Sequence, residues 1–219
     1  MEALLEGGAM KERPIIFSGE SVRAILDGRK TQTRRVVFAN ARTNNGFDFA
    51  VDRIEAALGK EKYFFAYAKR DTVGKQVLCP YGAPDNQLWV RESFSAWFQM
   101  AHWRDATQRT KETCDNLFYR ATHHFPDDDQ KWVAAIYMPR WASHITLEIV
   151  NVRVERLWEI SREDCIAEGI GSYTFARGAI SDNPPDYRWK FIEIWDIING
   201  KRAPWSSNPF VWVLEFKKL

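Results

Sequence analysis

No stretch of apolar residues in this 219-residue sequence approaches the roughly 20 residues that a membrane-spanning helix needs. The first ten residues are too few and too acidic to form a secretory signal peptide. The run from Met10 to Pro14 is typical of a natural start, and we interpret residues 1–13 as an N-terminal tail. We therefore expect a cytoplasmic protein that has no membrane partner.

Cysteine and histidine are scarce and poorly placed for a metal site. The three cysteines are odd in number and far apart, which argues against a disulfide framework and favours a reducing compartment. There is no Cys-x-x-Cys pair, and the adjacent His123 and His124 cannot reach one metal from a regular helix face. We expect neither a metal nor any other cofactor.

Excess charge is also lacking: 31 basic and 29 acidic residues leave a net charge of +2, which by itself identifies no partner. The basic residues nevertheless gather between positions 21 and 35, where Asp27 is opposed by Arg23, Arg29, Lys30, Arg34 and Arg35. Such a cluster is either a solvated face or a binding surface for nucleic acid. Aromatic residues make up 14% of the chain, and we expect most of them in the core and a few free to stack on bases.

The N-terminal part of the chain predicts a strand, a helix and a second strand. The apolar run 14–17 favours a strand, Ser18 offers a helix N-cap, and apolar residues at helical spacing continue to a stop at Gly28. The basic stretch then leads to a predicted strand at 36–38. Further local elements are a turn at 79–82 and strands at 88–92 and 117–120.

The clearest pattern lies between residues 144 and 157. Apolar residues alternate up to Ile149 and then shift by one position to Val150, which predicts a long strand with a bulge or bend. Ser161 and Asp164 resemble a capping box that opens a short helix ending at Gly169. The remaining elements are a helix after Pro184–Pro185 that ends at Gly200, and a final strand at 210–216 that is apolar on both faces. Trp189, Ile192, Trp195 and Ile198 follow one another along that helix, and the helical spacing of the two tryptophans predicts that they face the core.

These elements predict an α+β fold with a curved sheet or small barrel and short flanking helices. No long linker divides the chain, so we expect a single domain over residues 14–219. Two stretches are interpreted as insertions, at about 40–73 and 97–135. The first is expected to hold a short helix near 51–58, and the second an acidic loop at 126–130.

The segment Ala24-Ile-Leu-Asp-Gly-Arg-Lys-Thr-Gln-Thr-Arg-Arg35 resembles the ASCH domain, whose signature is a helix followed by Gly-x-Lys-Thr-x-Thr-x-Arg. The resemblance extends to the strand near 86–92, the long strand at 144–157, the helix ending in Ala167-Glu-Gly169 and the last strand, about two-thirds of the chain. Segments 139–143 and 208–212 resemble a bacteriophage and prophage subgroup, some of whose members are called morphogenetic proteins. The resemblance implies a PUA-like β-barrel, an association with RNA and a bacterial host cell.

One branch of the ASCH family consists of amidohydrolases that remove the acyl group from N4-acetylcytidine. Resemblance to that branch implies that Lys30, Thr33 and Glu168 are catalytic. Amide hydrolysis needs a nucleophile, a base and an acid for the leaving amine. Thr33 suits the first role, Lys30 the second if desolvation lowers its pKa, and Glu168 a proton shuttle. The alternative is that Lys30 and the arginines hold phosphates while Thr33 donates a hydrogen bond.

Further side chains are candidates for binding RNA or a modified nucleoside. Arg29, Arg34 and Arg35 supply positive charge, and Trp89 supplies a stacking face. Glu92 is a candidate reader of an exocyclic amine or an alternative acid; Arg91, Arg140 and Trp141 complete the set. For each of these residues a purely structural role on a strand face remains open.

Four functions are compatible with the sequence: a non-catalytic binder of RNA or of a modified nucleobase, an N4-acylcytidine amidohydrolase, a ribonuclease, and a phage structural or assembly protein. The first predicts salt-dependent binding to nucleic acid, and the second predicts turnover of N4-acetylcytidine. The third predicts RNA cleavage that depends on Lys30, and the fourth predicts association with virion components.

Overall fold

A five-stranded sheet forms the centre of the structure, with strand order β1-β6-β9-β10-β2. The computed structural model describes residues 11–37, 56–59, 62–66, 76–98, 111, 114–123, 131–170 and 187–219. The strands of this sheet are β1 (Glu12–Ile16), β6 (Gln87–Arg91), β9 (Thr146–Arg156), β10 (Phe210–Lys218) and β2 (Gln32–Val36). β1 pairs with β6 in parallel, and the other neighbours are antiparallel. The predicted α+β class is confirmed.

The sheet is open within the part of the chain that the structure describes: its strand pairs leave β1 and β2 at the two edges, so the expected closed barrel is not found there. The two edges are nevertheless linked by a side chain, because Arg35 Nη2 on β2 donates a hydrogen bond of 2.6 Å to the carbonyl of Ile16 on β1. The sheet therefore curls far enough to bring its edges within reach of one arginine.

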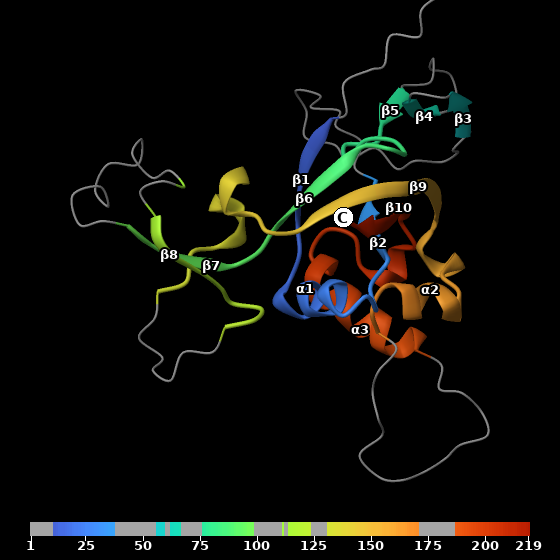
Figure 1. Cartoon of the computed structure of the whole chain (residues 1–219). Coiled ribbons are helices and arrows are strands. Elements are labelled where there is room, and N and C mark those ends of the chain that lie inside the picture. Colours follow the sequence, from blue (N-terminus) through green and yellow to red (C-terminus); the bar gives the residue numbers. More distant parts are fainter. Residues whose placement is uncertain are drawn as a thin grey trace, which may run out of the picture.

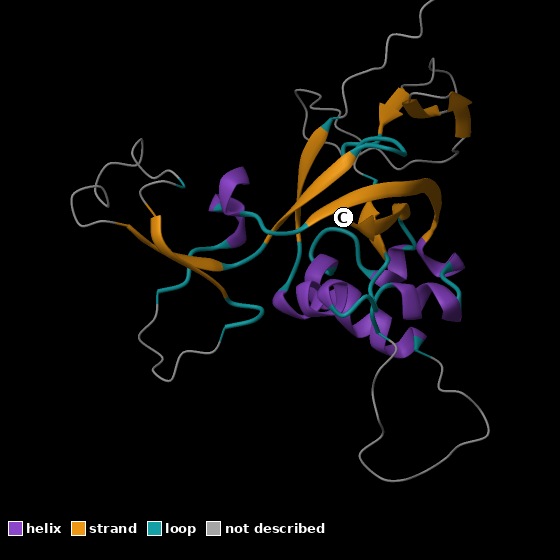
Figure 2. Cartoon of the chain, in the orientation of Figure 1, coloured by secondary structure: helices purple, strands orange, loops and turns teal. Residues whose placement is uncertain are grey.

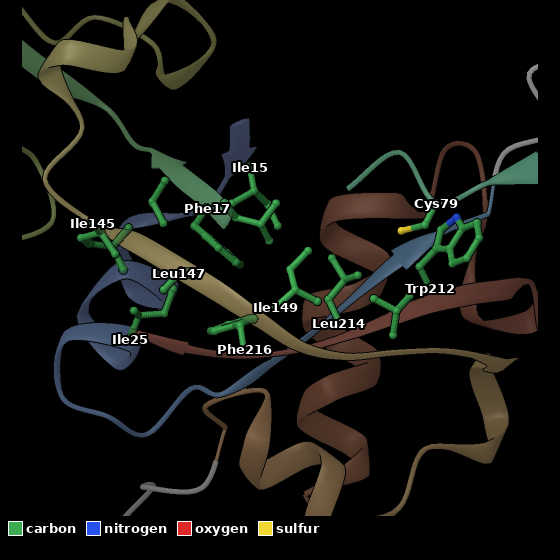
Figure 3. Close-up of a cluster of buried hydrophobic side chains, with 14 of the residues drawn as sticks. Ile15, Phe17, Ile25, Cys79, Ile145, Leu147, Ile149, Trp212, Leu214 and Phe216 are labelled. Carbon is green, nitrogen blue, oxygen red and sulfur yellow. The ribbon is translucent and has the colours of Figure 1, made fainter. Parts of the chain in front are cut away.

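The main hydrophobic core lies on the face of the sheet that packs against α1 (Gly19–Leu26). Figure 3 shows its side chains in a row along the strands, with Ile15 and Phe17 facing Leu147 and Phe216. A second cluster on the opposite face includes Val211 and Val213 of β10 and residues of α2 (Arg162–Ala167) and α3 (Arg188–Asn199). Because both faces of β10 are covered, its two alternating sets of side chains are buried, as the sequence predicted.

The predicted irregularity in the long strand is confirmed. Along β9 and β10, Asn151 pairs with Glu215 but Ile149 pairs with Phe216, so Val150 is skipped in the register. Val150 is 53% exposed, whereas Ile149 is buried. This bulge explains the shift of the apolar phase and adds local bending to the strand.

The helix ends follow the predicted capping residues. The Ser18 side chain accepts a hydrogen bond from the Ser21 N–H and caps α1, and Ser161 and Asp164 form a reciprocal capping box on α2. Gly28 and Gly169, at the two helix ends, have φ of +72° and +88°, which favour glycine.

The predicted inward stripe of α3 is wrong in part. Trp195 is buried, but Trp189 and Ile198 are 57% and 66% exposed. The face that meets the sheet is formed by Phe191 and Trp195, with Ile194 packed against them. Contact with β10 thus selects a stripe rotated from the one that tryptophan spacing indicated.

Other predicted boundaries also shift. The second strand begins at Gln32, not at 36, because β10 extends its pairing into the basic stretch. β1 begins at Glu12, inside the predicted tail. The turn at 79–82 is found as predicted, and the strands expected at 88–92 and 117–120 are found with shifted bounds, at Gln87–Arg91 and Cys114–Tyr119.

The predicted insertions contain further strands. In the first lie β3 (Ala56–Gly59) and β4 (Lys62–Ala66), which form a small antiparallel sheet with β5 (Gln76–Leu78) just after it. The helix expected near 51–58 is therefore wrong where the structure describes it. β8 (Cys114–Tyr119) lies in the second and pairs with β7 (Phe94–Phe98), which overlaps its start; the two strands extend away from α1, α2 and α3 in Figure 1. The predicted loop at 126–130 lies outside the described residues.

Short connections complete the described fold. These connections include the 3-10 helices Ala135–Tyr137, Arg140–Ala142, Leu157–Glu159 and Trp205–Ser207. Figure 2 shows α1, α2 and α3 gathered beside β2 and β10, and the site described below lies among them. Among the residues described, no helix has the length and apolar character required to cross a bilayer.

Candidate functional site

The loop that follows α1 turns Lys30 into the protein. After the positive-φ residue Gly28, the backbone N–H groups of Arg29 and Lys30 both donate to the carbonyl of Ala24, at 2.8 and 3.0 Å. Thr31 N–H then donates to the carbonyl of Ala167 at 2.9 Å, and Lys30 and Glu168 form an isolated antiparallel bridge. The glycine stop of the helix thus places the basic motif against the end of α2.

Lys30 and Glu168 form a buried ion pair. Lys30 Nζ lies 2.7 Å from Glu168 Oε2 and 2.8 Å from the backbone carbonyl of the same residue. Their side chains are 4% and 7% exposed. The neighbouring Gly169 permits this close approach, since an added Cβ would lie 3.1 Å from the Cβ of Lys30 and 3.0 Å from that of Ala24.

Arg34 holds the other oxygen of Glu168. Its Nη1 lies 3.4 Å from Glu168 Oε1, and its Nη2 contacts Glu155 and lies 2.9 Å from Asp164 Oδ2. Since the Arg34 side chain is almost fully buried, its guanidinium is engaged by three carboxylates and is not presented to a phosphate. The sequence suggested a ligand-binding role for Arg34, but its contacts are those of a residue that fixes Glu168.

A second arginine completes this network. Arg153 lies 2.8 Å from Asp164 Oδ1 and contacts Glu155 and Glu215, and Gln32 Nε2 donates to Asp164 Oδ1 at 2.9 Å. Burial raises the pKa of Asp164, but hydrogen bonds from Gln32 and the Ser161 N–H and the two arginine charges hold that pKa down at about 2. Asp164 is therefore an anion across the neutral pH range.

The pKa of Lys30 is lowered from its ordinary value. Burial is the largest cause; Glu168 opposes it, and the charges of Arg35 and Arg34 act in the same direction as burial. The lowered pKa makes the neutral amine more accessible than it is in an exposed lysine, while Lys30 at rest is paired with Glu168. In its neutral form Lys30 has a lone pair and can accept a proton.

A cavity of about 690 Å³ opens beside this pair. Lys30, Thr33 and Glu168 all line it, so the structure brings the three predicted catalytic residues together. The rest of the wall combines apolar and aromatic side chains with arginines: Phe17, Phe191, Ile194, Trp195, Ile198, Arg23, Arg29, Arg34 and Arg35. Small-molecule sites have this size and this mixture of apolar wall and few polar groups.

Thr33 lies on β2, opposite Leu214 of β10, and is buried. Among the residues described, its hydroxyl has no hydrogen-bond partner. A buried hydroxyl that lines a cavity is suited to a partner supplied by a ligand.

Arg29 and Arg35 line the same cavity but differ in their surroundings. The Arg29 guanidinium lies at the rim, 39% exposed, and pairs with Asp27 at 2.8 Å. Arg35 lies over the ring of Phe17, with 5.1 Å from its guanidinium carbon to the ring centroid. Both predicted ligand-binding arginines are thus near the predicted catalytic residues.

The predicted binding residues on β6 lie away from the cavity. Trp89 is buried, with Arg91 at 4.6 Å and Arg140 at 6.0 Å from its ring centroid, so its stacking face is covered by the protein's own cations. Arg140 also forms a bidentate pair with Glu12.

Glu92 and Trp141 are likewise outside the cavity. Glu92 is buried and lies 2.8 Å from His144 Nε2, while the His144 ring stacks on Tyr119 at 3.8 Å between centroids. Trp141 packs against a small cluster that contains Phe94 and Met138. Their contacts are those of residues with a structural role, which is the alternative that the sequence left open for them.

Several residues of the site were not expected from the sequence. Phe191 and Trp195 form part of the cavity wall, Glu155 and Asp164 hold Arg34, and Arg153 pairs with those same two carboxylates. A usable signal was the alternation along residues 32–35, which places Gln32 and Arg34 on one face and Thr33 and Arg35 on the other.

The described residues contain no group of His, Cys, Asp or Glu side chains able to hold a metal ion. Compared with protein-family models, with curated proteins and with solved structures, the chain finds no match in any of the three.

Proposed function

We propose that this protein is a hydrolase of the ASCH type that removes the acyl group from an N4-acylated cytidine or a closely similar nucleobase amide. The observation that carries the proposal is the convergence of a buried Lys30–Glu168 pair and an unpartnered Thr33 hydroxyl on one cavity. Those are the three side chains that the resemblance to the deacylating branch implies.

The chemistry assigns one step to each residue. Thr33 Oγ attacks the acyl carbon in the form of the protein in which Lys30 is a neutral amine, and the Thr33 proton passes to that amine. The tetrahedral intermediate then loses the nucleobase amine, which takes the proton back from Lys30, and leaves an acyl ester on Thr33. Water hydrolyses that ester, with Lys30 again accepting and returning a proton.

Glu168 supports these steps by position and charge. Its carboxylate holds Lys30 Nζ at 2.7 Å and is itself held by Arg34. When Lys30 becomes an ammonium ion during the reaction, the adjacent carboxylate stabilises that charge. The ring faces and aliphatic side chains of the cavity wall provide a surface for a flat base.

The finer fold assignment belongs to the same proposal. We infer a PUA-like domain, supported by the helix–glycine–lysine motif and by a sheet whose edges meet through Arg35. Non-catalytic binding of a modified nucleobase is the second candidate, favoured by the cavity's size and its aromatic wall. No contact of the described residues specifically favours a ribonuclease or an assembly protein.

The test is incubation of the purified protein with N4-acetylcytidine while cytidine is measured by liquid chromatography. We expect cytidine and acetate from the wild type and loss of turnover in Lys30→Met, Thr33→Val and Glu168→Gln. Thr31→Val is the matched control, because Thr31 is exposed and two residues from Thr33. Absence of turnover at high enzyme concentration would remove the hydrolase, and binding of N4-acetylcytidine in the same sample would then favour the binder.

A further inference from the structure

Neighbouring Arg34 and Arg35 point to opposite faces of β2. Arg34 pairs in register with Val213, which belongs to the cluster beneath α2 and α3, and Arg35 pairs with Trp212 of the main core. Thr33 pairs with Leu214, which also belongs to the main core. Since side chains alternate along a strand, Thr33 and Arg35 share one face, and both line the cavity.

Arg35 lacks the carboxylate partners that surround Arg34. Its Nη2 donates to the carbonyl of Ile16, and its guanidinium lies over Phe17, as does the amine of Lys30 at 5.8 Å from the ring centroid. Its Nε is buried and has no hydrogen-bond partner, and no carboxylate in the described part of the chain forms an ion pair with it. Burial accordingly lowers the pKa of Arg35 from its ordinary value.

The other arginines of the cavity are engaged or exposed. Arg34 is held by carboxylates, Arg29 pairs with Asp27 at the rim, and Arg23 is exposed and donates to the carbonyl of Ala121. Arg35 therefore brings a cation to the cavity with no carboxylate in ion-pair contact, and Glu168 acts on its charge only from a greater distance. A buried charge of this kind is costly unless a ligand or a developing charge compensates it.

We propose that Arg35 is a further catalytic residue, which binds the acyl oxygen of the substrate and stabilises the negative charge that develops there. This inference rests on the proposed hydrolase function. As Thr33 Oγ bonds to the acyl carbon, the carbonyl π electrons move to the oxygen, and the Thr33 proton passes to Lys30. The guanidinium is already positioned when that charge appears, so it stabilises the transition state more than the neutral amide. On collapse the electron pair re-forms the carbonyl as the carbon–nitrogen bond breaks.

The test compares Arg35→Met and Arg35→Lys with the wild type on N4-acetylcytidine. Loss of one oxyanion donor lowers kcat by about 100- to 1000-fold, and we expect that fall in Arg35→Met with little change in KM. Arg35→Lys keeps the charge without the fork of donors and should fall between the two. Arg202→Met is the matched control, since Arg202 is exposed and lies outside the cavity.

A second measurement separates this role from loss of structure. Guanidinium ions at millimolar concentration should restore part of the activity of Arg35→Ala and leave that of Arg202→Met unchanged. Circular dichroism at the assay temperature shows whether each variant is folded, and Arg35→Lys serves if the larger changes unfold the protein. Wild-type turnover with an unchanged kcat in folded Arg35→Met or Arg35→Lys would overturn the inference alone. Absence of wild-type turnover would overturn the hydrolase and, with it, this role.

Discussion

Breaking the Lys30–Glu168 pair from either side should destabilise the protein, and breaking both sides at once should cost much less than the sum. Both side chains are more than nine-tenths buried and 2.7 Å apart. Removing one partner of a buried pair costs about 3–5 kcal/mol, because it leaves the other charge without compensation. Lys30→Met leaves Glu168 with Arg34 at 3.4 Å, so we expect the lower end, about 3 kcal/mol.

Glu168→Gln is expected to cost more than Lys30→Met, because it removes the carboxylate that both Lys30 and Arg34 contact. In the double variant the unpaired lysine charge is gone, and its stability should be close to that of Glu168→Gln. The resulting coupling energy equals the cost of Lys30→Met, about 3 kcal/mol. For a protein of this size, about 3 kcal/mol lowers Tm by about 6–12 °C.

The assay is urea unfolding followed by circular dichroism for the wild type, both single variants and the double variant. The exposed pair between Arg140 and Glu12 is the matched control, with side chains 43% and 38% exposed at 2.8 Å. Its coupling should stay below about 1 kcal/mol. If the Lys30 and Glu168 changes add to within about 0.5 kcal/mol, the two side chains are not coupled and the reasoning on the site is wrong.

Two further predictions concern the surroundings of this pair. Gly169→Ala should lower the free energy of unfolding in urea by about 1–3 kcal/mol, because φ is +88° and the new Cβ would lie 3.0 Å from the Cβ of Ala24. Gly28→Ala, at φ +72° with open space around it, should cost less. Equal costs would show that the close approach at Gly169 is unimportant. Asp164, with its pKa lowered from 3.8 to about 2, should add stability above pH 4 that is lost as pH falls towards 2, since the folded state holds the anion. Asp164→Asn should remove this pH dependence of Tm, and an unchanged profile between pH 4 and pH 2 would contradict it.

The features that were predicted correctly are those determined by nearby residues. The shift from Ile149 to Val150 marks a bulge because alternation is a property of one strand. The capping box of Ser161 and Asp164 and the stop at Gly28 depend on a single turn of helix. Such signals need no knowledge of the partner strand.

The features that were predicted wrongly depend on distant contacts. The inward face of α3 is selected by Val211 and Val213, so the exposed Trp189 cannot be distinguished from the buried Trp195 by spacing alone. The start of the second strand was placed at 36, but pairing with the last strand moves it to Gln32. The surroundings of Trp89 also depend on distant residues, because Arg91 and Arg140 cover its ring and Arg140 comes from a segment about fifty positions away.

That pairing also divides the basic motif into parts with different tasks. If residues 29–35 formed a loop, their charges would share one solvated surface, and the number of positive charges would be enough to describe how that surface binds an anion. Once β10 pairs with β2, alternation turns Arg34 towards Glu155, Asp164 and Glu168, where its charge is neutralised. The same alternation turns Arg35 to the opposite face of β2, where it lines the cavity beside Thr33 and its Nε has no protein partner. Neutralising Arg34 should therefore mainly lower the stability of the protein, whereas neutralising Arg35 should mainly lower kcat. A shared electrostatic surface does not predict this contrast.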